Sequence, residues 1–87
     1  MTLSWKERES MKFKVKLPGQ DSINIMTELQ LKKIYKNEVN TKMMDNLGDG
    51  AEWRKWYFLY DDLEEDLTTI NDMLKVLTEL GYKIERV

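Results

Sequence analysis

Residues 11–17 read MKFKVKL, a strict alternation of apolar residues and lysines. Successive side chains of a β-strand point to opposite faces of the sheet. This period of two therefore predicts a strand with one buried face and one lysine-lined face. Lysine often guards an unpaired sheet edge, so we expect an edge strand here. Pro18 and Gly19 follow and predict a turn over residues 18–22.

Residues 23–47 can be interpreted in two ways. Alternating apolar residues from Ile23 to Leu31 would continue a hairpin. However, Thr27 and Gln30 have the spacing of a helix capping box, and apolar residues then recur every four positions up to Leu47. We favour a short strand at 23–26 and a helix at about 28–46 that ends before Gly48. A strand over residues 23–35 stays open as the alternative.

The remaining segments predict a strand, a helix and a final strand. The stretch 52–60, EWRKWYFLY, is rich in aromatic residues and predicts a central strand that is covered on both faces. Residues 63–80 carry an apolar stripe with helical spacing and end at Gly81, which predicts a second helix. Residues 82–87 alternate again and predict a final short strand.

These elements predict an α+β fold in the order β-(β)-α-β-α-β. We expect a mostly antiparallel sheet of three or four strands with two helices packed on one face. A ferredoxin-like or split βαβ arrangement is a candidate topology. Residues 1–10 are interpreted as an N-terminal arm, and residues 11–87 as a single α+β domain.

The 87-residue chain contains neither cysteine nor histidine. This excludes thiol catalysis, Ser-His-Asp triads and the usual zinc sites. The four glycines form no phosphate-binding pattern, and residues 45–56 lack the carboxylates that a calcium loop requires. We therefore expect a protein that is not an enzyme, with no cofactor and no metal. The absence of cysteine, of a signal peptide and of a long apolar run predicts a cytoplasmic location.

Two neighbouring features are candidates for a partner-binding surface. Trp, Tyr and Arg are common interface anchors, but a small core also needs its aromatic residues. A dense acidic segment can start a helix, dock in a basic groove of a partner, or bind a divalent cation. The candidate aromatic and arginine residues are Trp53, Arg54, Trp56 and Tyr57. The acidic residues, which we place at the start of the second helix, are Asp61, Asp62, Glu64, Glu65 and Asp66.

Basic residues supply a rival surface. Residues 1–44 carry a net charge of +4 and residues 45–87 a net charge of −6, which predicts a dipolar molecule if the two halves remain apart in space. A lysine patch beside an exposed aromatic residue suits single-stranded nucleic acid. The candidate nucleic-acid-binding residues are Lys12, Lys14, Lys16, Lys32, Lys33 and Lys36.

The sequence favours a small non-enzymatic protein-interaction module that docks on a host protein through the acidic and aromatic residues. Its size, its lack of cysteine and histidine, and its split charge are typical of a phage or mobile-element inhibitor or regulator. Two alternatives stay open: a nucleic-acid-binding domain that uses the lysines, and a homo-oligomeric structural module joined through an edge strand.

Overall fold

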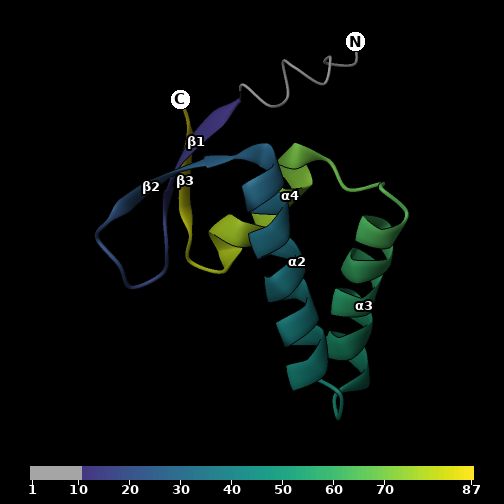
Figure 1. Cartoon of the computed structure of the whole chain (residues 1–87). Coiled ribbons are helices and arrows are strands. Elements are labelled where there is room, and N and C mark those ends of the chain that lie inside the picture. Colours follow the sequence, from purple (N-terminus) through teal and green to yellow (C-terminus); the bar gives the residue numbers. More distant parts are fainter. Residues whose placement is uncertain (1–10) are drawn as a thin grey trace.

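The computed structural model describes residues 11–87, which form a three-stranded antiparallel sheet and three helices (Figure 1). The predicted α+β class is confirmed. The observed order is ββαααβ, which differs from the predicted order and from a ferredoxin-like arrangement. The predicted arm, residues 1–10, lies outside the described residues. The elements are β1 Lys12–Lys16, β2 Ile23–Thr27, α2 Glu28–Asp45, α3 Gly50–Glu64, α4 Ile70–Glu79 and β3 Lys83–Arg86.

The lysine-rich strand β1 is the central strand of the sheet, with the strand order β2-β1-β3. The expectation of an edge strand was therefore wrong. Lys14 pairs with Ile25 on one side and with Glu85 on the other, so the backbone of β1 is paired along both edges. The lysines mark the uncovered face of the sheet, while Phe13 and Val15 on the opposite face are buried.

The capping box that starts α2 is formed as the sequence predicts. The backbone N–H of Gln30 donates to Thr27 Oγ1 at 3.2 Å, and the backbone N–H of Thr27 donates to Gln30 Oε1 at 2.8 Å. The helix continues to Asp45, so the alternative of a strand over 23–35 was wrong beyond Thr27. Its C-cap is Asn46, two residues before the expected Gly48.

The aromatic stretch at 52–60 is not a strand but lies inside helix α3. Asp49 caps this helix, because its Oδ1 accepts from the backbone N–H groups of Ala51 and Glu52 at 3.2 and 3.3 Å. Residues 50–64 contain no valine, isoleucine or threonine, and so lack the β-branched residues that favour strands. Aromatic residues are compatible with either structure, and here the cap and the packing of Trp56 and Leu63 favour the helix.

The helix predicted over residues 63–80 is divided between two elements. The C-cap of α3 is Glu65, and Asp66 follows with a left-handed φ of 58°. A second capping box then starts α4: the Thr69 side chain accepts from the Asp72 N–H, and the Asp72 side chain accepts from the Thr69 N–H, both at 3.2 Å. The expected glycine at the end is confirmed, because Gly81 has a φ of 102°.

Helix α2 lies between the sheet and α3. Its residues Leu31, Tyr35 and Val39 have no exposed surface. Helix α4 packs on α2 and β3, whereas α3 packs mainly on α2 and lies beside the sheet rather than over it (Figure 1). The fold is accordingly flat, with principal extents of 40 × 34 × 15 Å. This placement leaves much of the surface of α3 in contact with solvent.

We predict that Thr27→Ala lowers the free energy of unfolding by about 1 kcal/mol, the usual cost of losing a helix N-cap side chain. Urea denaturation measures the change. Ser22→Ala, in the exposed loop before β2, is the matched control and should leave the unfolding midpoint unchanged. Equal midpoints for the two variants would mean that the cap contributes nothing to stability.

Alkaline pH should destabilise the fold through Tyr82. Burial, together with donation of the phenol Oη to Glu38 Oε1 at 3.0 Å, raises the pKa of Tyr82 from 10.0 to about 12. The folded state then holds a proton that the unfolded state releases, so this contribution is complete below pH 10.0 and is lost as the pH rises to about 12. Urea denaturation of Tyr82→Phe across this range should show a smaller decline than the unchanged chain. Tyr57→Phe, which alters an exposed tyrosine, should decline like the unchanged chain.

Candidate interaction surface

Helix α3 separates its side chains into a buried and an exposed set. Trp56 and Leu63 are buried against the core, and Leu59 and Tyr60 are partly buried beside them. Of the predicted partner-binding residues, Trp56 is thus a core residue, while Arg54 is exposed. The amino group of Lys55 lies 5.1 Å from the centre of the Trp56 ring. The aromatic cluster is therefore shared between the core and the surface.

Three aromatic rings form a row of contacts on the solvent side of α3, with Tyr57 between Trp53 and Phe58. Trp53 and Tyr57 stack with ring centres 5.0 Å apart and an angle of 19° between planes. Tyr57 meets Phe58 edge-on at 6.2 Å. Tyr57 is 41% exposed and Phe58 is 58% exposed. Phe58 was not among the predicted site residues; only a helical interpretation of residues 50–64 would have placed it beside Tyr57 on the surface.

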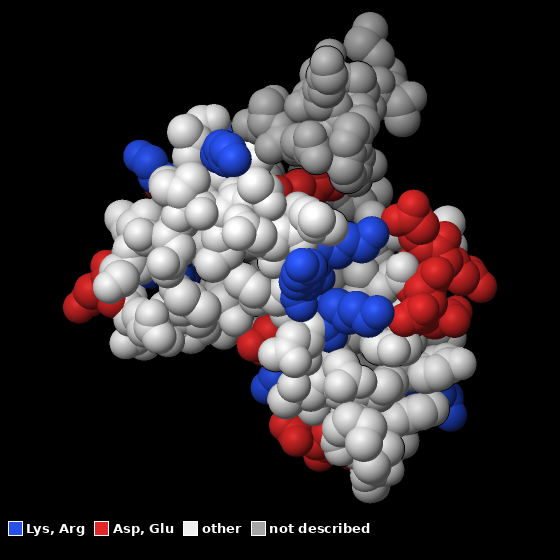
Figure 2. Space-filling model, in the orientation of Figure 1, with Lys and Arg blue, Asp and Glu red and all other residues white. Residues whose placement is uncertain are grey.

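The predicted acidic residues lie at the end of α3 and in the turn after it, where Figure 2 shows a patch of carboxylates. Their expected position at a helix start was wrong. A helix C-terminus carries a partial negative charge, so acidic residues here add to the local negative potential instead of offsetting a positive one. The interpretation of this segment as acidic residues that complement a helix dipole is therefore excluded by the structure.

Two lysines of α2 compensate part of this charge. Lys32 Nζ lies 3.2 Å from Asp66 Oδ1, and Lys36 Nζ lies 3.3 Å from Glu64 Oε1. Both pairs are exposed, so each contributes at most about 1 kcal/mol. The two oppositely charged halves of the sequence thus meet in space, which argues against the predicted dipolar molecule.

The remaining acidic residues continue the aromatic surface. Trp53, Tyr57, Asp61 and Glu65 are spaced four apart, which places them along one side of α3 up to its C-cap. Within residues 11–87, Asp61 and Glu65 form no ion pair. We call this surface the acidic–aromatic face. It consists of Trp53, Tyr57, Phe58, Asp61 and Glu65.

The candidate nucleic-acid-binding lysines occupy two separate surfaces. Lys12, Lys14 and Lys16 follow the uncovered face of the sheet, where Lys16 Nζ lies 3.6 Å from Asp21 Oδ1. The other three, Lys32, Lys33 and Lys36, belong to α2, which covers the opposite face of the sheet. The structure therefore does not join the six lysines into the continuous patch that the sequence suggested.

No group of three or more carboxylates among residues 11–87 is arranged to hold a metal ion. In the same part of the chain, none of the helices is long and apolar enough to cross a membrane.

Comparisons of the chain with protein-family models, with curated proteins and with solved structures find no match.

Proposed function

We propose that this chain is a non-enzymatic protein-interaction module that docks on a partner protein through the acidic–aromatic face. The observation that carries the proposal is the stacked Trp53–Tyr57 pair with Phe58 beside it, on the outer side of a helix. Stacked rings lose little conformational freedom on binding and bury a large area, which is why tyrosine and tryptophan dominate interface energetics. Phe58 is 58% exposed and contacts the stacked pair, so the three rings offer a shared apolar area to a partner.

Charge defines the chemistry of the partner. Asp61 and Glu65 follow the aromatic residues along α3 and lie at its C-terminal end. Their charges and the negative end of the helix dipole together make the local potential negative. Complementarity requires lysine or arginine on the partner, next to an apolar pocket that accepts the rings. We therefore propose a partner surface that combines an apolar pocket with a basic rim.

The biological setting is part of the same proposal. Absence of cysteine fits a reducing compartment, so we place the interaction in the cytoplasm. A chain of 87 residues with no catalytic constellation suits an inhibitor or regulator encoded by a phage or mobile element, acting on a host protein. An acidic helix end that occupies a basic site on the host protein would be the inhibitory contact.

The test uses the tagged full chain to capture host proteins, followed by binding measurements with the purified partner. Tyr57→Ala combined with Phe58→Ala should weaken binding by about thirtyfold or more, the effect of losing about 2 kcal/mol at an aromatic hot spot. Glu65→Lys should slow association and reduce its dependence on salt, because it reverses a charge at the rim.

A matched control alters apolar residues of similar exposure elsewhere. Ile23→Thr combined with Ile25→Thr changes the uncovered face of the sheet, where these residues are 63% and 57% exposed. This control should bind the partner as the unchanged chain does. Loss of binding in the control with retention in the aromatic variant would refute the acidic–aromatic face. Retention of oligonucleotides at low salt that depends on Lys12 and Lys14 would favour the nucleic-acid alternative instead.

A further inference from the structure

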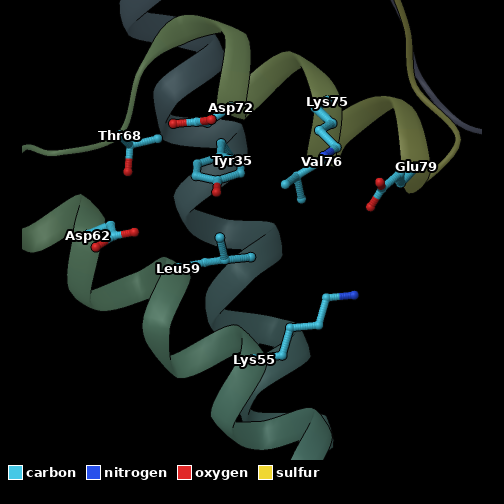
Figure 3. A pocket seen from close by; sticks show the side chains of 9 residues that line it. All are labelled: Tyr35, Lys55, Leu59, Asp62, Thr68, Asp72, Lys75, Val76 and Glu79. Atoms are coloured by element: carbon cyan, nitrogen blue, oxygen red, sulfur yellow. The ribbon is translucent and has the colours of Figure 1, made fainter.

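A cavity of about 420 Å³ lies between α2, α3 and α4. Figure 3 shows its lining side chains converging from the three helices. Leu59 of α3 and Val76 of α4 supply apolar walls, and Tyr35 of α2 supplies part of the floor. The remaining lining residues are polar or charged: Lys55, Asp62, Thr68, Asp72, Lys75 and Glu79.

Two buried hydroxyl groups in this cavity lack hydrogen-bond partners. Tyr35 has no exposed surface, and its Oη has no partner within residues 11–87. Its hydroxyl points into the space between α3 and α4 (Figure 3). Thr68 Oγ1 is likewise buried and unpartnered. A buried hydroxyl without a partner costs about 1–3 kcal/mol, so a polar group that entered the cavity and bonded to these hydroxyls would offset that cost.

Carboxylates surround these hydroxyls. Burial first, and then the charges of Asp72 and Asp62, raise the pKa of Tyr35 to about 12, so its phenol remains a neutral hydrogen-bonding group at neutral pH. One oxygen of Asp72 already accepts from the Thr69 N–H at 3.2 Å, which fixes the carboxylate and leaves its other oxygen available. Asp62 forms no ion pair among the described residues. This end of the cavity is rich in acceptors and carries negative charge.

We propose that the cavity receives the guanidinium group of an arginine side chain that the partner protein presents. The inference rests on the proposed function, since Asp62 lies at the end of α3 next to the acidic–aromatic face. Guanidinium is planar, stays charged and offers five N–H donors, which suits acceptors that converge from three helices. Leu59 and Val76 would pack against the aliphatic part of the arginine.

Other ligand chemistries fit this end less well. An anion would meet the charges of Asp62 and Asp72 beside Tyr35. A metal ion lacks a ligand set, because no suitable group of three carboxylates occurs among residues 11–87. The amino group of Lys55 points away from Tyr35, and Lys75 is on the same face of α4 as Glu79, toward the other end of the cavity (Figure 3).

The direct test is a titration of the isotope-labelled full chain with N-acetyl-arginine amide. The NMR chemical shifts of the backbone amides report binding. We expect saturable shifts at Thr68, Thr69 and Asp72. Asp62→Asn and Tyr35→Phe should each weaken binding by about tenfold, the effect of one hydrogen bond to a charged group. Tyr35→Phe should remain folded, because it removes an unpartnered hydroxyl from the core. Asp45→Asn, an exposed carboxylate at the end of α2 and outside the cavity, should bind normally.

Two further probes, one neutral and one with an ammonium group, test whether the cavity requires a guanidinium group. N-acetyl-citrulline amide, which has the same shape without the charge, should not bind. Equal binding of citrulline, tighter binding of N-acetyl-lysine amide, or no saturable shift with arginine would each refute the guanidinium site. Tyr57→Ala with Phe58→Ala should bind the arginine probe normally while it loses the partner. If the arginine probe does not bind the chain but the Tyr57/Phe58 variant still loses the partner, only this inference is refuted. If the probe binds as expected but the Tyr57/Phe58 variant keeps the partner, only the proposed function is refuted.

Discussion

Burial of helix α2 from two sides is the constraint on which the rest of the structure depends. Leu31, Tyr35 and Val39 recur every four residues and are completely buried, so one stripe of α2 carries much of the core. The sheet and α4 cover this helix from one direction, and α3 covers it from another. Among the elements of residues 11–87, only α2 contacts both the sheet and α3 to this extent, and the capping box at Thr27 fixes where α2 begins.

This arrangement explains why an acidic and aromatic surface is available at all. Since α3 packs on α2 and lies beside the sheet, the fold is only 15 Å deep and α3 is covered along one side (Figure 1). Trp56 and Leu63 fill that side, Tyr60 packs partly beside them, and the rings of Tyr57 and Phe58 remain exposed. Phe58 is 58% exposed, so much of its apolar surface would leave water only on contact with another molecule.

The sequence predicted an element correctly where its pattern is compatible with only one kind of secondary structure. It was misleading where the same residues are compatible with both a strand and a helix. Alternation over 11–17 and the Thr27–Gln30 pair correctly indicated β1 and the start of α2. Aromatic richness suggested a strand at 52–60, although Asp49 and Glu52 have capping spacing and β-branched residues are missing there. Strand order, and with it the central place of β1, depends on pairing between distant segments that local patterns do not encode. The acidic residues were assigned to the wrong end of a helix because residues 52–60 were interpreted as a strand before them. The pairing of Lys32 with Asp66 joins segments far apart in the sequence, which local patterns do not encode.

Tyr35 connects the constraint on α2 with the functional argument. Its ring is required to fill the space among the three helices, but phenylalanine would fill that space as well, without burying an unpartnered hydroxyl. The hydroxyl therefore has a cost that packing does not explain. Asp62 and Asp72 lie near enough to affect its ionisation, and a cationic donor placed among the three groups would satisfy all of them at once. In the isolated chain the fold bears the cost of the buried hydroxyl, and a bound cationic group would offset it. Because Tyr35 belongs both to the core and to the lining of the cavity, binding of a cationic group there would stabilise the fold.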